Sequence, residues 1–327
     1  TSGGDAMADS SITVANPSGN QWTCKADVAD GDTDGTVAFS IAFTDSAGNA
    51  GTAVSAVTDS SAVTVDNTHP TLTIAMSTNG NAGYAKSGQV ITLTITASET
   101  VTGLVCTIDG EATTMGGSGT SWTSALTISG DETQQNTVFS CASHVDAAGN
   151  AGVTDTTANS GAVIVDYTAP TSTSAVIATS GTGNANDADV VTLTLNPSET
   201  VGTPTCTWTD GSGAMADTSV TYGTTGDDSH TAAVTVANAD EDGAVGFSCT
   251  YSDLAGNAIA SAITSTSDSS SVTIDNTHPT LTAVGIAVDN TGNANDGDDI
   301  TLTFTASETV GTPTCTFTSG GDAMADS

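Results

Sequence analysis

Hydrophobic and polar residues alternate over short stretches of the chain, and Gly, Asn and Asp gather between those stretches. The clearest stretch is Ile91–Thr96, in which apolar side chains alternate with threonines. Residues 22–28 and 122–128 show the same spacing, and each begins with a tryptophan. A period of two places alternate side chains on opposite faces of a strand, and no stretch keeps the period of a helix. The pattern predicts an all-β protein.

The order of these stretches predicts several β modules. In residues 1–65 we expect strands at 22–28, 37–43 and 62–65, which would be the last strands of a module whose first strands are missing. From Thr71 onward the strand pattern starts again, and it restarts twice more further along. About seven short strands in ~100 residues, with turn signals between them, are typical of an antiparallel sandwich.

Two motifs mark the end of each module. Asp-x-Ala-Gly-Asn is followed, roughly twenty residues later, by Val/Ile-Asp-x-Thr-x-Pro-Thr. The first motif occurs at 45–49, 146–150 and 253–257, and the second at 65–71, 165–171 and 274–280. From this spacing we expect tandem modules in a linear array, divided as 1–69, 70–169, 170–278 and 279–327.

A longer repeat is visible at the ends of the chain. Residues 1–10 and 318–327 both read TSGGDAMADS, an offset of 317 residues. This offset indicates a super-repeat of three modules of about 105 residues each. We therefore expect the chain to begin and end at the same point of a longer periodic sequence, inside a module.

The charge narrows the possible partners. Asp and Glu number 37, Lys25 and Lys86 are the only basic residues apart from histidines, and the net charge is -35. Such a chain has no means of neutralising phosphates, which excludes nucleic acid as a partner. The acids are dispersed between strands rather than massed in tails, which argues against disorder. They indicate either a solvated surface for a salty medium or carboxylates that bind divalent cations. No apolar run approaches the ~18 residues of a membrane span.

The six cysteines form no Cys-x-x-Cys pair, which argues against zinc. Two cysteines in each complete module indicate one disulfide per module in a secreted chain. We expect Cys106–Cys141 and Cys206–Cys249, each worth roughly 3 kcal/mol in the chain-entropy view. Cys24 and Cys315 have no neighbour of this kind, and we expect these two positions to pair across the boundary of the 317-residue period.

Three phrases carry a resemblance to a known group of proteins. Residues 91–99 and 300–308 read Ile-Thr-Leu-Thr-x-Thr-Ala-Ser-Glu, and the two end-of-module motifs accompany them. Together they resemble the tandem bacterial Ig-like repeats of giant extracellular surface proteins and adhesins, over the whole chain. The resemblance implies a non-enzymatic extender, outside the cell, that binds calcium at its module junctions.

The sandwich topology suggests where such calcium would bind. With strands lettered A to G, the BC and FG turns lie where the chain enters a module, and the AB turn lies where it leaves. Carboxylates, amides and carbonyls are the ligands Ca²⁺ prefers. The candidate ligands are Asp66, Glu99, Asp146 and Asn150; Asp166, Glu199, Asp253 and Asn257; Asp275 and Glu308; and, in AB loops, Asp187, Asp189, Asp296 and Asp298. Each Asp can instead cap its own turn.

No Ser-His-Asp order, nucleophile elbow or phosphate loop recurs between modules, so we expect no enzyme. The leading hypothesis is a structural segment of a long extracellular fibre, sheath or adhesin stalk, rigidified by Ca²⁺ and disulfides. Its expected partners are neighbouring copies of the same repeat along the chain, and exposed sheet edges can also pair copies side by side. The rival hypothesis is a module that recognises a glycan, ice or host surface through outward-facing threonines such as Thr92, Thr94 and Thr96.

Overall fold

The computed structural model describes residues 1–7, 12–81, 83–225, 228–320 and 322–323. Parts of both copies of the repeated decapeptide therefore lie outside the described residues. The chain forms two compact units: Thr1–Ala169 with Ser252–Ala258, and Pro170–Tyr251 with Ile259–Ser327. Every regular element among the described residues is a β-strand, so no helix there could cross a membrane.

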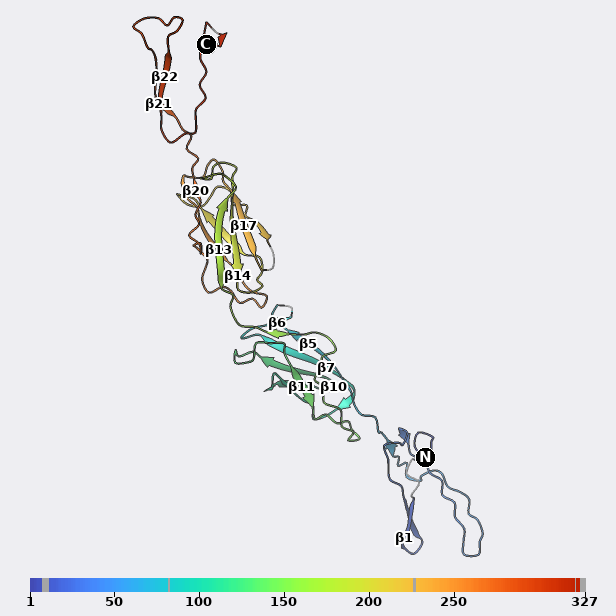
Figure 1. The fold of residues 1–327 in the computed structure, drawn as a ribbon. Helices are drawn as coiled ribbons and strands as arrows, with labels where there is room; N and C mark the ends of the chain where they lie inside the picture. Colours follow the sequence, from blue (N-terminus) through green and yellow to red (C-terminus); the bar gives the residue numbers. More distant parts are fainter. Residues whose placement is uncertain (8–11, 82, 226–227, 321, 324–327) are drawn as a thin grey trace. The chain divides into compact units, whose positions relative to one another are not determined.

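The first unit contains a two-layered sandwich. One layer has the strand order β10-β7-β5, in which β7 is central and both pairings are antiparallel (Figure 1). These strands are β5 (Leu72–Thr78), β7 (Val90–Val101) and β10 (Thr114–Thr127). Ile95 of β7 lies opposite Ile74 on one side and Trp122 on the other. Alternate residues of β7 are buried, as the sequence alternation predicts.

The other layer of this sandwich has the order β11-β8-β9. Its strands are β8 (Val105–Ile108), β9 (Glu111–Ala112) and β11 (Phe139–Ala142). On the far side of β11, Asp155 forms an antiparallel bridge with Cys141, so the segment after the Asp146 turn adds to this layer. The module is completed by β12 (Ile164–Val165), which pairs in parallel with β6 (Tyr84–Ala85).

The second unit contains a sandwich with the same plan. One layer has the order β13-β14-β17-β16, and the other pairs β15 with β19 (Figure 1). Ile263 bridges to Cys249 beyond β19. The strands are β13 (Ser172–Thr179), β14 (Val190–Pro197), β15 (Thr205–Thr209), β16 (Thr221–Thr224), β17 (His230–Thr235) and β19 (Gly246–Thr250).

Read in chain order, these two layers are A-B-E-D and C-F-G, which is the strand arrangement of an immunoglobulin constant-type domain. The edge of the module is closed by β18 (Gly243–Ala244), which pairs with β20 (Thr273–Ile274). The core is aliphatic and includes Val191, Leu193 and Leu195, all fully buried. The fold is therefore all-β and Ig-like, built from tandem repeats.

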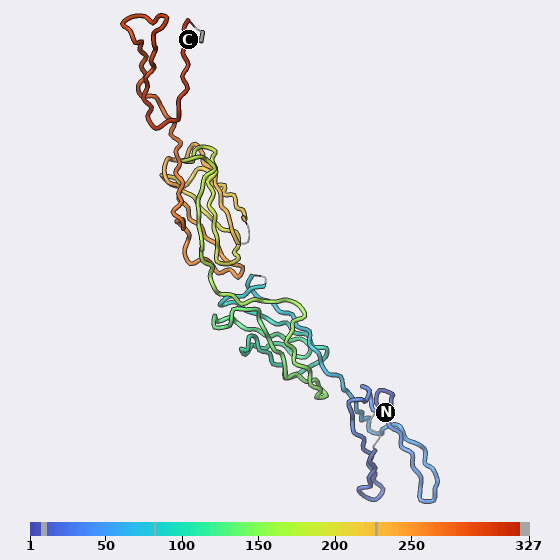
Figure 2. Tube along the Cα trace, in the orientation of Figure 1, coloured from blue at the N-terminus to red at the C-terminus, as the bar shows by residue number. Residues whose placement is uncertain are grey.

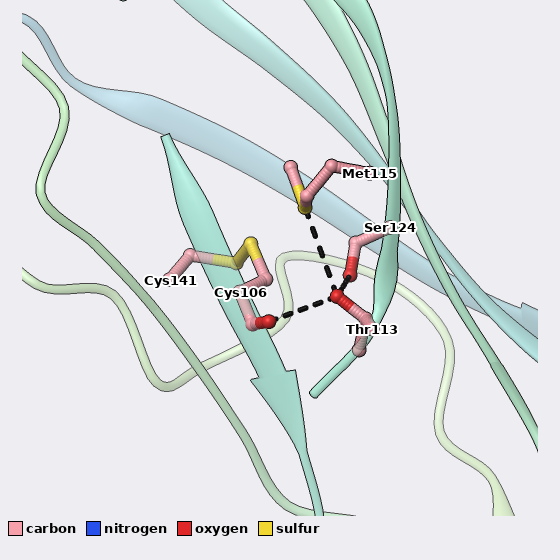
Figure 3. Close-up of a disulfide and its surroundings, with 5 residues drawn as sticks. All are labelled: Cys106, Thr113, Met115, Ser124 and Cys141. Carbon is pink, nitrogen blue, oxygen red and sulfur yellow. Dashed lines mark hydrogen bonds between the residues drawn. A yellow bond between two sulfur atoms is a disulfide. The ribbon is translucent and has the colours of Figure 1, made fainter. Parts of the chain in front are cut away.

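Each sandwich contains one disulfide between the C and F strands. These are Cys106–Cys141 and Cys206–Cys249, with Cα atoms 4.1 Å apart in both. Figure 3 shows the surroundings of the first bond. The Thr113 hydroxyl donates to the Cys106 carbonyl at 2.8 Å and accepts from the Ser124 hydroxyl at 2.7 Å. Cys24 and Cys315 are free and exposed.

Residues 279–320 and 322–323 follow the second sandwich in the chain and belong to the second unit. They form the hairpin of β21 (Leu281–Val288) and β22 (Ile300–Ala306), and then a short β23 (Thr318–Ser319) and β24 (Asp322–Ala323). In Figure 2 the orange-to-red trace shows this hairpin followed by a separate extended arm.

The strands of residues 1–69 differ from those that the alternation predicts. The strands are β1 (Thr13–Ser18), β2 (Gln21–Lys25), β3 (Gly35–Thr36) and β4 (Thr64–Val65). The expected strand at 37–43 is absent, and only an isolated bridge joins Ile41 to Val54. In the complete module the equivalent strand β19 pairs with β15, and residues 1–69 contain no segment equivalent to β15. A strand sequence without its hydrogen-bonding neighbour does not form a ladder.

Candidate cation site at the entry of the first sandwich

The turn 146–150 holds one carboxylate in a defined position. The Oδ1 atom of Asp146 accepts hydrogen bonds from the backbone N–H groups of Gly149 (2.7 Å) and Asn150 (2.8 Å). Its Oδ2 atom accepts from the side-chain amide of Asn150 at 2.8 Å. Gly149 has φ = 101°, a value that favours glycine, so the motif needs Gly at this position. Asp146 therefore caps its own turn, and it is buried while doing so.

The same turn is tied to the linker that enters the module. The Asn150 side-chain amide also donates to the backbone carbonyl of Asp66 at 2.8 Å. His69, further along this linker, has Nδ1 2.7 Å from the carbonyl of Ala151. The linker and the 146–150 turn are thus joined by hydrogen bonds from two side chains.

Three carboxylates converge where this linker meets the module. Asp66 follows β4, Glu99 lies near the end of β7, and Asp146 follows β11. Each offers an oxygen, and these oxygens all lie within 4.8 Å of one another. Asp66 and Glu99 are half-buried, so the group is close to the surface but partly shielded from water. The structure therefore brings together the three acids that the sandwich topology places at this joint.

The electrostatics of the group are those of crowded like charges. The pKa of Glu99 is raised, first by desolvation and then by the negative charges of Asp146, Asp66 and Asp34. Burial alone would raise the pKa of Asp146, but hydrogen bonds from Asn150 and Gly149 outweigh it and leave that pKa below its usual value. Asp146 is therefore held ionised, whereas ionisation of Glu99 is opposed by its neighbours.

This arrangement can hold a metal ion. Its donor atoms are oxygens, and no sulfur or imidazole belongs to the group. The chain has two lysines and no arginine, and none of the groups that shift the pKa of Glu99 is a cation. Because the Asn150 N–H groups already donate to Asp146 and Asp66, only its oxygen is free to act as a ligand.

The next repeat reproduces part of this arrangement within the first unit. Asn257 donates to Asp253 Oδ2 at 2.8 Å and to the backbone carbonyl of Asp166 at 3.0 Å, as Asn150 does to Asp146 and Asp66. Glu199, the third predicted acid of that set, belongs to the second unit. Its place beside Asp166 and Asp253 stays a prediction from the equivalence of the repeats.

The predicted residues at the third joint are placed separately. Asp275 lies beside the AB loop, where its N–H donates to the Ala185 carbonyl at 2.9 Å and its Oδ2 lies 3.5 Å from Asn184 Nδ2. Glu308 has one carboxylate oxygen, Oε1, that is buried without a hydrogen-bond partner among the described residues. No third acid joins these two in a described group of three.

The AB-loop acids mainly cap their own turns. Asp189 Oδ2 accepts from the N–H of Asn186 at 3.0 Å, and Asp298 Oδ2 accepts from the N–H of Asn295 at 2.8 Å. Asp187 is exposed, and so is Asp296. None of these four is brought into a described three-acid group, so their role as ligands stays a prediction.

Sequence reasoning missed a second set of contacts that holds each exit linker. Asp34 Oδ1 accepts from the N–H of Asn67 at 2.6 Å, and Asp242 Oδ1 accepts from the N–H of Asn276 at 2.6 Å. In the middle module Gln134 Oε1 takes this place and accepts from the N–H of Tyr167 at 2.9 Å. The signal in the sequence is the recurrence of Asp or Gln at equivalent positions of the loop before the F strand.

The comparisons with known proteins concern the fold alone. No family model matches the chain, and no curated protein matches it significantly. Among solved structures, an I-band fragment of titin is 9% identical, covers 79% of this chain and 82% of its own, and has a TM-score of 0.34.

A chimeric titin Z1Z2 is 12% identical, has a TM-score of 0.31, and covers 63% of this chain and 96% of its own. The tandem Ig repeats of Dlar are 13% identical, have a TM-score of 0.20, and cover 63% of this chain and 97% of their own. The last of these descriptions names tandem Ig repeats. At such TM-scores they add no argument, and the Ig-like assignment of this chain rests on its strand order.

Proposed function

We propose that the chain is a structural segment of a long extracellular fibre, sheath or adhesin stalk, without catalytic activity, in which Ca²⁺ fixes the linkers between Ig-like modules. The observation that carries the proposal is the convergence of Asp66, Glu99 and Asp146 from three separate segments. Two of these acids lie on turns of one module, and the third lies on the linker that enters it.

A cation changes the balance of forces at this joint. Without one, three carboxylates repel each other, and the pKa of Glu99 is raised first by desolvation and then by this repulsion. A divalent cation turns each of these charges into a ligand, so the linker gains a bond to both turns of the module. The hydrogen bonds of Asn150 then orient the joint before the ion arrives.

Calcium suits this ligand set better than magnesium or zinc. Ca²⁺ accepts about six to eight oxygens in flexible geometry, whereas Mg²⁺ demands a near-ideal octahedron and keeps its waters. Zinc prefers Cys and His ligands in a tetrahedron. Two carboxylates in this group are half-buried, which leaves room for water to complete the coordination. The disulfides and the strongly acidic surface are consistent with a secreted location.

The test is thermal unfolding and small-angle scattering of the chain with Ca²⁺ and then with EGTA. A free Ca²⁺ concentration a hundredfold above Kd stabilises a one-site protein by about 2.7 kcal/mol. We expect Ca²⁺ to raise the melting temperature and to narrow the range of interdomain distances, and we expect Mg²⁺ at the same concentration to do so less. Asp66→Asn removes a linker ligand and should reduce both effects by the share that this joint contributes.

Asp155→Asn is a matched control, because Asp155 lies in the same module and outside the three-acid group. It should leave the response to Ca²⁺ intact. Identical melting and scattering with Ca²⁺ and EGTA would show that the acids serve solubility only. A response to Ca²⁺ that is unchanged in Asp66→Asn would place the cation elsewhere.

A second candidate function has its own supporting observation. The outer face of the layer β10-β7-β5 carries small, mostly hydroxyl-bearing side chains. Thr94 lies between Ala75 and Thr123, and Thr96 lies between Thr73 and Ser121. Such a flat face can contact a regular glycan or ice surface. Threonine is also common in strands without any binding role, because it has a high β-propensity.

Substitution on this face separates the two candidates. Thr94→Lys places a charge in the middle of the outer face, where Thr94 is exposed. It should abolish adsorption to glycan arrays or ice if the face is a recognition surface, and it should leave Ca²⁺-dependent stiffening unchanged. Absence of adsorption by the unmodified chain would leave the structural segment as the sole candidate.

A further inference from the structure

The turn at residues 253–257 is covered by other parts of the first unit. Residues 252–258 belong to that unit, although Tyr251 and Ile259 on either side of them belong to the second. Ala255, in the middle of the turn, is only 1% exposed. Turns ordinarily lie on the surface of a protein, so a buried residue in the middle of one must be covered by a neighbouring segment. The first unit therefore contains a surface that binds this turn.

Two side chains from the segment between β5 and β7 contact the turn. Asn81 Nδ2 donates to the Leu254 carbonyl at 3.0 Å, and Lys86 Nζ donates to the Gly256 carbonyl. A Cβ atom at Gly256 would lie 3.4 Å from Asn81 Nδ2 and 3.5 Å from Lys86 Nζ. Both donors therefore lie close to this one glycine, and their two acceptors come immediately before and after Ala255 in the chain.

The two acceptors are carbonyls that the turn does not use for its own closure. The Asp253 N–H donates to the Asn257 carbonyl at 3.1 Å, and the Gly256 N–H donates to the Asp253 carbonyl at 3.2 Å. The carbonyls of Leu254 and Gly256 take part in neither bond. A backbone carbonyl that is removed from water needs a donor. The segment between β5 and β7 supplies one donor to each of them.

The two donor residues are fixed by hydrogen bonds of their own backbone. The Lys86 N–H donates to Gln89 Oε1 at 2.9 Å, and the Gln89 N–H donates to the Lys86 carbonyl at 3.0 Å. The Tyr84 N–H donates to the Asn81 carbonyl at 2.9 Å. Donors that are already held in place lose less conformational freedom when they bind. The surface is therefore formed in advance of the contact.

A third hydrogen bond joins the same turn to the linker beside these donors. Asn257 Nδ2 donates to the Asp166 carbonyl at 3.0 Å. The Asp166 N–H in turn donates to the carbonyl of Ala85, the residue before Lys86, at 2.9 Å. The linker and the segment between β5 and β7 are thus bonded to each other, and both contact the turn.

Lys86 is an unusual residue for this chain. The sequence has two lysines, no arginine and 37 acidic residues. Lys86 is half-buried in the contact, whereas Lys25 is exposed. The other repeats have Asn186 and Asn295 at the position of Lys86, and the N–H of each is likewise accepted by the side chain three residues later. A charged donor forms a stronger hydrogen bond than a neutral one. This repeat therefore has a donor that the other two lack.

We propose that Asn81 and Lys86 form a recognition site for the turn at 253–257 and hold this turn on the first unit without any metal ion. The site binds a turn with two unused carbonyls and a small residue between them. Because the residues on either side of the turn belong to the second unit, the site restricts motion between the two units in EGTA as well as in Ca²⁺. It goes beyond the proposed Ca²⁺ joint, since its donors are an amide and an ammonium group.

The first test compares the reactivity of the two lysines. The chain is treated in EGTA with a limiting amount of an acetylating N-hydroxysuccinimide ester, digested with an Asp-specific protease and analysed by mass spectrometry. An ammonium group must lose its bond to the carbonyl before the amine can react. We expect Lys86 to be acetylated roughly tenfold more slowly than the exposed Lys25. Equal rates would overturn the proposal.

Ala255→Gln breaks the contact from the side of the turn and leaves both lysines in place. A longer side chain has no room at a position that is 1% exposed, so the turn is displaced. Lys86 should then react nearly as fast as Lys25. Ala148→Gln is the matched control, because Ala148 has the equivalent place in the turn at 146–150 and is exposed. Slow acetylation of Lys86 that survives Ala255→Gln would also overturn the proposal.

Small-angle scattering in EGTA measures the consequence for motion between the units. Lys86→Met keeps a long side chain and removes the ammonium group, so it should widen the range of interdomain distances. Adding Asn81→Ala removes the second donor and should widen the range further. Lys25→Met removes the other lysine, outside the contact, and should leave the distances unchanged. An unchanged range in the chain with both Lys86→Met and Asn81→Ala would contradict the site.

The response to Ca²⁺ keeps this proposal distinct from the proposed function. Widening by Lys86→Met in EGTA that Ca²⁺ then reverses would support both proposals. Widening in EGTA on which Ca²⁺ has no effect would support the recognition site and refute the calcium joint. A response to Ca²⁺ without any widening by Lys86→Met and Asn81→Ala would refute the recognition site and retain the calcium joint.

Discussion

The side-chain amide of Asn150 donates a hydrogen bond to the backbone carbonyl of Asp66, 84 residues earlier in the chain, at 2.8 Å. Its other N–H group donates to Asp146, so one amide joins the turn and the linker. The bond from Asn257 to the carbonyl of Asp166 repeats this relationship. The Asp-x-Ala-Gly-Asn motif therefore does two things, since it closes its own turn and it holds the preceding linker.

This dual role predicts that Asn150→Ala destabilises more than Asn49→Ala. Both substitutions remove a hydrogen bond to the turn aspartate, but only Asn150 also bonds a linker carbonyl within the described structure. The additional loss should be about 1 kcal/mol, the typical net value of a hydrogen bond. Denaturant unfolding of each variant in EGTA measures the difference. Equal costs would mean that the bond to Asp66 adds no stability.

Amide hydrogen exchange gives an independent check on the same pair. In the unmodified chain the N–H of Thr68 donates to Asp66 Oδ1. In Asn150→Ala this amide should lose its protection from exchange, because the linker loosens. Asn49→Ala should leave that amide unchanged. Faster exchange at Thr68 in both variants would contradict a direct role of Asn150 in holding the linker.

The strands of the complete modules could be predicted from the sequence because both sides of each ladder are present. Alternation over Val90–Val101 matches its burial, since both neighbours are present: β5 precedes it in the chain and β10 follows it. Residues 37–43 alternate as well, yet they form no strand. Alternation indicates which face a strand would bury. A ladder also needs a hydrogen-bonding neighbour, and the local sequence does not show whether that neighbour is present.

The acids of the candidate site followed from topology, but their connections did not. The BC and FG turns share one end of the sandwich, and this topology predicts that Glu99 and Asp146 lie near Asp66. The direction of the Asn150 amide was not predictable, because it depends on which carbonyl lies beside it. The contact of Asp34 with Asn67 was missed because it joins residues 33 apart across a loop with no motif of its own.

Glu99→Gln is predicted to have effects of opposite sign with and without a cation. Without one, the raised pKa of Glu99 means that its ionised form is unfavourable in the folded joint. Neutral glutamine relieves that repulsion, so the variant should unfold at a higher temperature in EGTA. In Ca²⁺ it has lost a charged ligand and should be stabilised less than the unmodified chain.

The pH dependence of that difference follows from the direction of the shift. A folded pKa above the unfolded one makes ionisation destabilising, so the advantage of Glu99→Gln is full above the folded pKa of Glu99. It should vanish as pH falls below the unfolded pKa, where Glu99 is protonated in both states. The exposed Glu111→Gln is the matched control and should show neither effect. An advantage that does not change with pH would point to packing rather than charge.

Removal of the Cys106–Cys141 disulfide should destabilise its module by roughly 3 to 4 kcal/mol, given the chain-entropy cost of a loop of this size. The matched change is Cys141→Ala with Cys106→Ala, which avoids a lone thiol in the core. Differential scanning calorimetry should show a lowered transition for this module and an unchanged transition for the module with Cys206–Cys249. Lowering of both transitions would mean that the two modules unfold together.

His144 and Tyr251 occupy equivalent positions two residues before the turn aspartate, and they should respond oppositely to phenylalanine. His144 is 1% exposed, and both ring nitrogens lack a hydrogen-bond partner among the described residues. Tyr251 is 4% exposed, and its hydroxyl donates to the Thr171 carbonyl at 3.2 Å. The first repeat already has Phe43 at this position.

His144→Phe removes two buried polar atoms that make no bond, so it should maintain stability or raise it by about 1 kcal/mol. Tyr251→Phe removes one of two hydrogen bonds to the Thr171 carbonyl, which keeps the bond from the Ser198 N–H, and should cost about 1 kcal/mol. Urea unfolding at one fixed, near-neutral pH measures both changes. A clear loss of stability in His144→Phe would show that the imidazole has a partner in solution, such as a bound water, and that this position is polar by requirement.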